Sequence, residues 1–272
     1  MLEVVCFGEI LWDIFEVGKR GAKPLAQRFR RELGGAPANV ATGLSRLGIR
    51  TAVVGAVGRD RFGQALRAHL AADGVVVDFV LELPNRTGLT FVMRDARGQP
   101  EFVFYRNASA DLAIRATDIR PEMALARWVL VGSSTLMTPD LARTTKRFLD
   151  LAVGAGARVL VDLNVRVHLW PSRAAMTRAI GGLVGRADLV KASDEDLRAL
   201  GARPDGIRWL ERHAPKASWL ITRGASAATA IGEHGEVHLP SLRAKCVDAT
   251  GAGDAFIAGS LAVLVAARAV PG

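Results

Sequence analysis

The chain has 272 residues, of which 50% are hydrophobic and 23% are charged, with 28 glycines. This length allows one large domain or two small ones, and it is sufficient to bury a core without staples or metals. The composition excludes a disordered chain and a coiled coil. Only two cysteines, Cys6 and Cys246, are present, which excludes a disulfide scaffold. This cysteine usage and the lack of a basic-then-apolar leader predict a cytoplasmic location.

The formal net charge is +9, and basic residues gather between Lys19 and Arg31. A basic patch can bind nucleic acid, but no nucleic-acid-binding motif accompanies this one. We therefore predict a solvated basic face that attracts an anionic small substrate, and no nucleic-acid partner. The longest weakly polar run, residues 255–267, is too short to cross a bilayer and predicts a buried helix, so we expect no membrane partner either.

Short apolar runs alternate with longer segments of helical periodicity through most of the sequence. The apolar runs predict strands at Leu2–Phe7, Ala52–Val57, Trp128–Val131, Arg158–Asp162, Leu189–Lys191 and Trp219–Thr222. Apolar residues at three- and four-residue spacing predict helices at Ala38–Leu47, Phe62–Ala72, Pro139–Val153 and Ser172–Gly185. The alternation predicts an α/β fold with a parallel sheet and helices on both of its faces.

One segment departs from this alternation. Leu89–Arg94 and Glu101–Arg106 both have strand character, and the turn-rich connection between them predicts an antiparallel hairpin without a crossover helix. Residues 14–33 are likewise neither helical nor core-like. Together, residues 14–33 and 85–108 form either a small β-sheet lid on the main domain or an ordinary edge hairpin. We predict a single domain over residues 1–272, and no internal repeat is present.

The most informative stretch is residues 247–256, VDATGAGDAF, which an apolar helical segment follows at once. At a helix N-terminus the backbone amides lack intrahelical partners, and the helix dipole favours negative charge. Gly251 and Gly253, with only Ala252 between them, allow a phosphate to approach the main chain closely. Asp254 is then either a favourable first-turn carboxylate or a general base that takes a proton from an attacking hydroxyl.

Two further motifs point to a small-molecule site. In the sequence GGAPAN at residues 34–39 the paired glycines permit tight turning, and Asn39 offers both donors and acceptors to a polyol. The alternative is a plain loop that begins a helix. Asp13 follows the first predicted strand, where open α/β sheets bind their ligands. The alternative for Asp13 is a solvated loop residue.

These motifs resemble the signatures of the ribokinase-like (PfkB) carbohydrate kinase family, and the similarity extends over residues 1–265. The resemblance implies a three-layer αβα sandwich with a Rossmann-like, mostly parallel sheet and a small β lid over the sugar. It also implies ATP and Mg²⁺, with a monovalent cation such as K⁺ as an additional cofactor. The fructokinase-like branch is the most similar one, which implies transfer of the γ-phosphate to a primary hydroxyl of a small sugar, fructose first.

The resemblance assigns roles residue by residue. Asp254 is implied as the catalytic base, and the backbone of Gly251, Ala252 and Gly253 as the anion hole. The implied sugar-binding residues are Asp13, Gly34, Gly35, Asn39, Tyr105, Arg106, Asp162, Asn164 and Arg166. The implied nucleotide-side residues are Lys191, Ser193, Asp196, Thr222, Gly224, Thr250, Gly251 and Gly253. No direct protein ligand to Mg²⁺ is implied, and Glu195 or Asp196 is expected to act on it through water. Scaffolding of the lid and sheet edge is the alternative role for Arg106, Asp162, Asn164 and Arg166.

The sequence departs from the family pattern in three places. The usual Asn-x-x-Glu is represented by SDED at Ser193–Asp196, and the turn that usually ends in glycine reads Gly224–Ala227. The C-terminus is short relative to the family, since residues 255–272 are all that follow Asp254. We therefore expect an adenine site that is incomplete, completed by a neighbouring chain, or completed by residues outside this sequence.

Several alternatives remain open at this point. On the same scaffold they are 2-keto-3-deoxygluconate kinase, ribokinase and nucleoside kinase, and the alternative of another class is a catalytically impaired sugar-binding protein. A dinucleotide-dependent oxidoreductase is disfavoured, because no glycine-rich turn follows the first strand. His234 and His238 flank Gly235 and predict a turn rather than a metal-binding pair. Besides a small sugar and ATP, the predicted partner is a second copy that covers the edges of the lid sheet.

Overall fold

The structure is a computed structural model that describes residues 1–17, 28–94, 100–201, 207–241 and 249–267. Its main sheet has nine strands in the order β13-β12-β11-β10-β9-β8-β1-β4-β5. Neighbouring strands from β5 to β11 are parallel, and β12 and β13 add an antiparallel hairpin. The strand bounds are β1 Leu2–Phe7, β4 Thr51–Gly58, β5 Val80–Leu83, β8 Ala126–Gly132, β9 Arg158–Asp162, β10 Leu189–Ser193, β11 Ser218–Thr222, β12 Ala227–Gly232 and β13 Gly235–Pro240.

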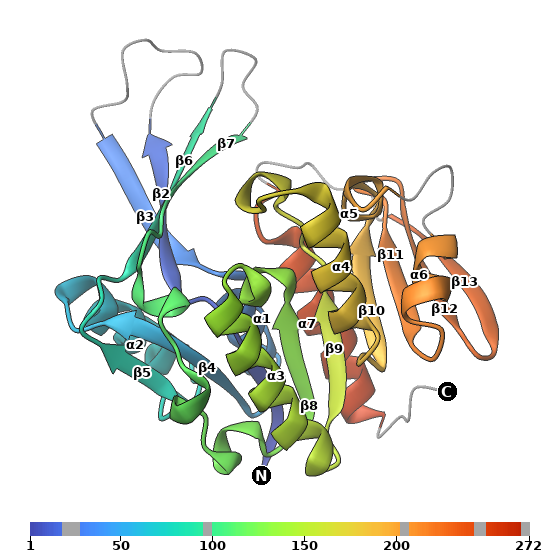
Figure 1. The fold of residues 1–272 in the computed structure, drawn as a ribbon, viewed down its shortest axis with the longest axis horizontal. Coiled ribbons are helices and arrows are strands. Elements are labelled where there is room, and N and C mark those ends of the chain that lie inside the picture. Colours follow the sequence, from blue (N-terminus) through green and yellow to red (C-terminus); the bar gives the residue numbers. More distant parts are fainter. Residues whose placement is uncertain (18–27, 95–99, 202–206, 242–248, 268–272) are drawn as a thin grey trace.

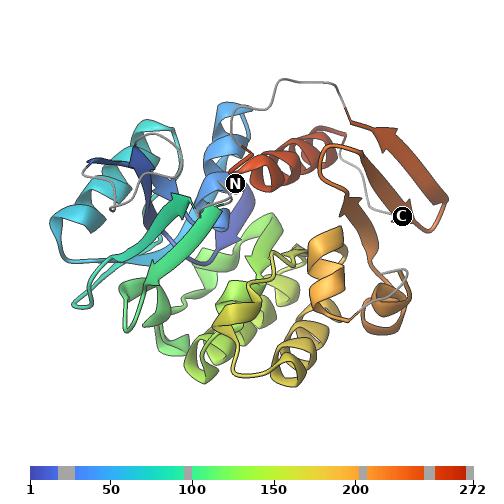
Figure 2. The same cartoon turned by 90° about the horizontal axis from the view of Figure 1, so that it is seen from above.

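Helices cover both faces of the main sheet (Figures 1 and 2). One face packs against α1 Ala36–Arg46, α2 Arg61–Ala72 and α7 Ala252–Ala266. The other packs against α3 Pro139–Gly154, α4 Arg173–Val184, α5 Asp194–Ala199 and α6 Ile207–His213. Short 3₁₀ turns complete the connections: η1 Ala110–Leu112, η2 Ala116–Asp118, η3 Pro121–Ala124, η4 Ser133–Leu136 and η5 Val167–Leu169. The three-layer α/β architecture predicted from the sequence is confirmed.

Strand β1 illustrates why the sequence folds in this way. Val4 and Cys6 are fully buried toward α1, α2 and α7, whereas Val5 and Phe7 are fully buried toward the opposite layer. Phe7 stacks on Phe148 of α3 with ring centroids 4.7 Å apart. Because successive side chains of a strand point to opposite faces, a continuous apolar run is what a strand covered on both faces requires.

A second sheet, the lid sheet, has four strands in the order β3-β2-β6-β7 and rises from the carboxyl ends of the main strands (Figure 1). Strands β6 and β7 form the predicted antiparallel hairpin, and β2 is parallel to β6 and antiparallel to β3. Trp12 anchors the base of this sheet, because its indole donates a hydrogen bond of 3.0 Å to the carbonyl of Phe62 in α2. The strand bounds are β2 Leu11–Val17, β3 Arg28–Gly34, β6 Gly88–Arg94 and β7 Pro100–Tyr105.

Several elements differ from the sequence prediction. β13 was not predicted: Val237 and Leu239 alternate with Glu236 and His238, but the strand is short and its side chains are exposed throughout. The turn predicted next to Gly235 is present at residues 233–234, between β12 and β13, and His238 lies on β13 with its Nε2 3.3 Å from Oε1 of Glu236. α7 is buried on one face only, since Val263 is 67% exposed. No helix in the described ranges is long and apolar enough to cross a membrane. Lys19, Arg20, Lys23, Cys246 and Asp248 lie outside the described residues.

Candidate active site

Among the described residues, nothing accepts a hydrogen bond from two backbone amides at the N-terminus of α7, which are called free amides below. Gly251 caps this helix with φ of 76°, a conformation that favours glycine, and no side chain within the described ranges caps it. The first intrahelical bond runs from the amide of Ala255 to the carbonyl of Gly251, at 2.9 Å. The amides of Gly253 and Asp254 therefore precede the hydrogen-bonded turns, whereas the amide of Ala252 donates to Ala249 at 3.1 Å. The two free amides and the helix dipole suit an anion.

A buried cation lies beneath this loop. Lys191, on β10, has its Nζ 3.2 Å from Oδ1 of Asp162 at the end of β9, and both side chains are almost fully buried. A Cβ placed on Gly253 would lie 3.2 Å from the same Nζ. Burial opposes the charge of Lys191, but Asp162 and Asp196 outweigh it and raise the pKa of Lys191. Burial also raises the pKa of Asp162 to about 6, despite the nearby lysine. The anion site thus has a positive charge below its amides.

Asp254 is joined to α1 by one hydrogen bond. The Nδ2 of Asn39 donates to its Oδ2 at 2.8 Å. Burial raises the pKa of Asp254, and the hydrogen bond from Asn39, with Lys191 and Arg166, works in the opposite direction. A carboxylate whose pKa is raised toward neutrality is better matched to accept a proton from a hydroxyl.

Asp13 reaches the same place from the lid sheet. It lies on β2, and a Cβ on Gly34 would stand 2.5 Å from its Cγ, so glycine is required beside it. Burial, together with the charges of Glu9 and Asp254, raises the pKa of Asp13 to about 7, against the opposing effect of Arg166 and Arg106. The charge of Asp254, at the edge of the main sheet, therefore reaches this carboxyl group of the lid sheet.

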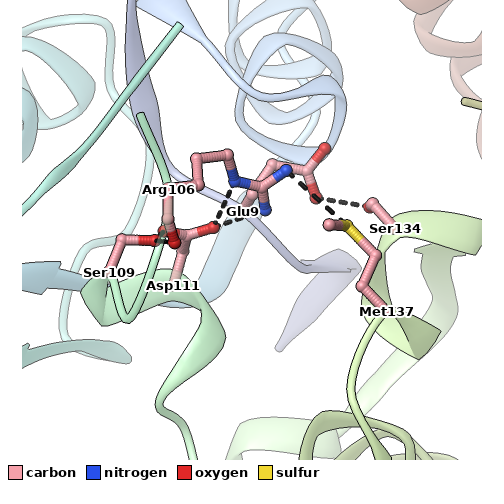
Figure 3. Close-up of polar contacts among 6 residues, drawn as sticks. All are labelled: Glu9, Arg106, Ser109, Asp111, Ser134 and Met137. Carbon is pink, nitrogen blue, oxygen red and sulfur yellow. Dashed lines mark hydrogen bonds and ion pairs between the residues drawn. The ribbon is translucent and has the colours of Figure 1, made fainter. Parts of the chain in front are cut away.

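Arg106 follows β7 at the base of the lid sheet and is buried (Figure 3). Its Nε donates to Oδ2 of Asp111 at 2.9 Å, and a second guanidinium nitrogen bonds the same oxygen. Ser109 donates to the other oxygen of Asp111 at 2.6 Å. The remaining guanidinium nitrogen lies 3.9 Å from Sδ of Met137. Burial disfavours the charged form of Arg106, but the negative charges of Asp111, Glu9 and Asp13 outweigh this effect and raise the pKa of Arg106.

The loop after β9 meets the lid sheet. Asn164 has φ of 34° there, which turns the chain sharply. The guanidinium of Arg166 lies 6.0 Å from the ring centroid of Phe102, and the rings of His168 and Phe104 are 5.2 Å apart. β7 therefore packs against this loop. The positive charge of Arg166 works to lower the pKa of Asp13 and of Asp254.

Other predicted residues lie elsewhere. Tyr105 is 64% exposed, and its ring packs edge-on against Phe91 with centroids 5.3 Å apart. It pairs with Leu89, one residue from Thr90, the partner of Asp13, so it points to the opposite face of the lid sheet. The structure therefore does not bring Tyr105 into the cluster.

The residues predicted for the nucleotide side line the same sheet edge. Ser193 caps α5 by accepting from the amide of Asp196 at 3.1 Å, and Asp196 accepts from the amides of Ser193 and Val165, at 2.8 and 2.7 Å. Both carboxylate oxygens of Asp196 thus accept hydrogen bonds from backbone amides, whereas Glu195 is exposed. The remaining predicted residues are Thr222, which pairs with Ser193 in register, Gly224 with φ of 54°, Gly35 with φ of 97° at the start of α1, and the exposed Thr250.

Sequence reasoning missed Glu9. It directly follows β1, and its Oε2 accepts a hydrogen bond of 2.6 Å from Ser134. Its charge acts on Asp13, Arg106 and Asp254. The signal that selected Asp13, a carboxylate at the carboxyl end of a buried strand, applies equally to Glu9 and could have found it.

Known proteins resemble this chain over most of its length. A model of the pfkB family carbohydrate kinases matches residues 1–270. Fructokinase-1 of Zea mays is 36% identical over 271 residues, which cover 96% of this chain and 83% of the maize protein. The fructokinase of Salmonella typhimurium is 37% identical over 238 residues, covering 86% and 77%. The crystal structure of fructokinase with bound ATP from Xylella fastidiosa has a TM-score of 0.84 and 32% identity, covering 97% of this chain and 81% of that one.

The geometry and the similarities agree. Anion-binding amides, a buried lysine and a nearby carboxylate suit transfer of a phosphoryl group, a reaction that depends mostly on positioning and charge stabilisation. They are gathered at the edge of the main sheet where its strands end, below the lid sheet. The match to the family model spans nearly the entire sequence, and the chain therefore belongs to the pfkB family of carbohydrate kinases.

Proposed function

We propose that this kinase transfers the γ-phosphate of ATP to a primary hydroxyl of fructose. The observation that carries the proposal is Asp254, which lies in the first turn of α7, accepts a hydrogen bond from Asn39 and influences the charge of Asp13. The similarity to proteins named fructokinase supports fructose as the sugar.

In the proposed reaction the sugar hydroxyl attacks the γ-phosphorus, and its proton passes to the carboxylate of Asp254. The bond from the γ-phosphorus to the bridging oxygen breaks, and ADP leaves. The amides of Gly253 and Asp254 and the ammonium of Lys191 stabilise the charge on the transferring group. General base catalysis contributes about 10²- to 10⁴-fold.

The donor set fits a phosphate chain better than a bare metal ion. The free amides at the start of α7 and the buried Lys191 suit phosphate oxygens. Within the described ranges, no cluster of three or more His, Cys, Asp or Glu side chains has metal-binding geometry. We infer that Mg²⁺ is held by the triphosphate and by water, and it would then neutralise phosphate charge. Glu195 is exposed and free to act through water, whereas both oxygens of Asp196 are engaged.

Arg166 favours a second candidate substrate, an acidic sugar such as 2-keto-3-deoxygluconate. The charge of Arg166 acts on both Asp13 and Asp254. No carboxylate in the described part of the chain forms an ion pair with it. A substrate carboxylate would give this guanidinium a partner. Fructose remains the first proposal, because Arg166 can also donate to hydroxyls.

The test is an ADP-release assay with ATP, Mg²⁺ and a panel of fructose, ribose, 2-keto-3-deoxygluconate and nucleosides. Fructose is expected to give the highest kcat/KM. Asp254→Asn is expected to lower kcat about 10²- to 10⁴-fold, while sugar affinity is retained. Gly259→Ala, in the same helix but with open space around its Cβ, is the matched control and should keep full activity.

Two outcomes would contradict the proposal in different ways. Unchanged kcat in Asp254→Asn would remove the assignment of the base. Sugar binding without phosphorylation of any sugar by the unmodified protein would favour the sugar-binding alternative.

We also propose that a second copy of the chain covers the outer face of the lid sheet. Phe91 packs against both Phe29 and Tyr105, with centroids 5.6 and 5.3 Å apart, which forms an aromatic row on the face opposite Asp13. Phe29 is 37% exposed and Tyr105 is 64% exposed. An identical aromatic face on a second copy would bury both rings.

A further inference from the structure

Glu9 occupies the junction between the two sheets. It stands between the end of β1 in the main sheet and the start of β2 in the lid sheet. A Cβ on Gly35 would lie 2.3 Å from the backbone oxygen of Glu9 and 3.2 Å from its Cγ, so the start of α1 presses directly on this residue. The position of Glu9 is thereby fixed relative to the helix that carries Asn39.

The carboxylate of Glu9 is anchored on one side and faces a cation on the other. Ser134, in η4 after β8, donates to its Oε2 at 2.6 Å (Figure 3). Met137, at the end of the same turn, has its Sδ 3.9 Å from the guanidinium of Arg106. The Glu9 charge in turn favours the charged form of Arg106. The guanidinium of Arg106 is therefore held from the lid side by Asp111 and faces Glu9, Ser134 and Met137 on the main-sheet side.

We propose that Glu9 is a positioning residue of the sugar pocket, which, anchored by Ser134, holds the Arg106 guanidinium against the carboxyl edge of β1 so that the base of the lid and the catalytic helix keep one arrangement. The inference rests on the proposed kinase function, since it concerns the same site. It assigns Glu9 no contact with the reacting atoms.

Charges from every neighbouring element bear on this role. The pKa of Asp13 on β2 is raised by burial and by the charges of Glu9 and of Asp254 in α7. It is lowered by the charges of Arg166, in the loop after β9, and of Arg106, after β7. The pKa of Asp254 is raised by burial and by the charge of Glu9. It is lowered by the hydrogen bond from Asn39 and by the charges of Lys191 on β10 and of Arg166. In both carboxyl groups the charge of Glu9 raises the pKa, so removing that charge lowers it.

Glu9→Gln separates charge from shape, because a glutamine can still accept the hydrogen bond of Ser134. The acid limb of the pH profile of kcat/KM is expected to move to lower pH by about 0.5 to 1 unit. KM for the sugar is expected to rise about fivefold, because Arg106 loses a charged neighbour. Ser134→Ala keeps the charge but removes the anchor, so KM should rise while the acid limb stays in place.

Glu3→Gln is the matched control. Glu3 lies at the opposite end of β1 and pairs with Arg127 at 3.1 Å, so the substitution removes the same charge far from the pocket. It should change neither KM nor the pH profile. A Glu9→Gln protein that behaves like Glu3→Gln would overturn the inference, even if its melting temperature fell.

If Glu9→Gln does not fold, Ser134→Ala decides the role of Glu9, and an unchanged KM in that variant overturns the inference. If the unmodified protein phosphorylates no sugar, the proposed function fails, and the inference is decided by carbon-detected NMR titration of the Asp13 carboxyl group. The pKa of Asp13 should fall in Glu9→Gln and stay in place in Glu3→Gln, and an equal pKa in both proteins counts against Glu9.

Discussion

A side chain at position 253 would meet the ammonium of Lys191, which makes this glycine a sensitive test of the anion site. In Gly253→Ala the added Cβ lies 3.2 Å from Nζ, so the flexible end of the lysine must move by a few tenths of an ångström. We expect the fold to be kept and kcat to fall by about tenfold, because the charge below the amides is displaced. Steady-state kinetics with saturating sugar and ATP measure this change.

Gly259→Ala separates that effect from helix propensity. It makes the same substitution two turns later in α7, where nothing lies within 4 Å of the added Cβ. It should raise the free energy of unfolding by about 0.5–1 kcal/mol and leave kcat unchanged. If both variants keep full activity, Lys191 does not serve the transferring phosphoryl group.

Single residues were predictable where their own neighbours in sequence define the chemistry. The glycines and Asp254 stand in one short stretch, so their gathering at a helix start could be expected from the sequence. Glu9 and Ser134 are far apart in the chain, and only the packing of β1 beside β8 brings them together. The resemblance to the fructokinase-like branch implied Tyr105 as a sugar-binding residue, but strand alternation turns its side chain to the other face.

At the scale of elements, α1 and α7 form a close contact, and Asp254, the proposed base, lies within it. Asn39 and Gly43 are one turn apart on α1, and Asp254 and Ala258 are one turn apart on α7. Asn39 bonds Asp254 at 2.8 Å, and a Cβ on Gly43 would lie 2.9 Å from the Cβ of Ala258. The two helices lie side by side in Figure 2. Their close approach therefore sets the length of the hydrogen bond between Asn39 and Asp254, the proposed base.

Gly43→Ala is expected to push the two helices apart. The overpacked contact should cost about 1–3 kcal/mol, offset in part by the better helix propensity of alanine. Because the Asn39 bond lengthens, kcat should fall as well. The reciprocal exchange Gly43→Ala with Ala258→Gly restores the spacing and should recover activity. Urea unfolding and kinetics on the unmodified chain, the two single variants and the double variant give the coupling free energy between positions 43 and 258. Purely additive effects would show that this contact does not position Asp254.

Elements buried on both faces were the most predictable part of the fold. β1 and β9 have the bounds expected from the sequence, because a continuous apolar run between helical segments has one physical explanation. β12 and β13 extend the sheet as an antiparallel hairpin, and the apolar residues of β13, Val237 and Leu239, stay exposed, so this strand lacks the continuous apolar run that marks the buried ones. β2 was expected only as part of an irregular lid segment, because its pairing with β6 joins residues far apart in sequence.

At the scale of the molecule, the aromatic row on the lid sheet predicts a dimer. Sedimentation velocity at micromolar concentration should give a dimer for the unmodified chain and a monomer for Phe29→Glu, because a buried carboxylate in the interface is costly. Leu47→Glu changes a residue that is 55% exposed after α1 and is the matched control, which should remain dimeric. A monomeric unmodified chain would contradict the proposal.

The cluster of carboxyl groups below the lid predicts that stability falls as the pH rises. The pKa of Asp13 is raised to about 7 and that of Asp162 to about 6, and that of Asp254 is also raised, whereas in the unfolded chain all three titrate near pH 4. Between about pH 4 and pH 7 the folded state therefore binds more protons than the unfolded state. The stability that these groups contribute is complete below about pH 4 and is lost as the pH rises through the folded-state values.

Urea unfolding without ligands should therefore give a higher free energy of unfolding at pH 5.5 than at pH 8, by about 1–4 kcal/mol. Asp13→Asn removes one of the raised groups, so it should flatten this slope and stabilise the protein most at pH 8. Asp78→Asn, at an exposed position outside the cluster, should leave the slope as it is. A free energy that stays constant or increases from pH 5.5 to 8 would mean that these carboxylates are better solvated than their burial below the lid indicates.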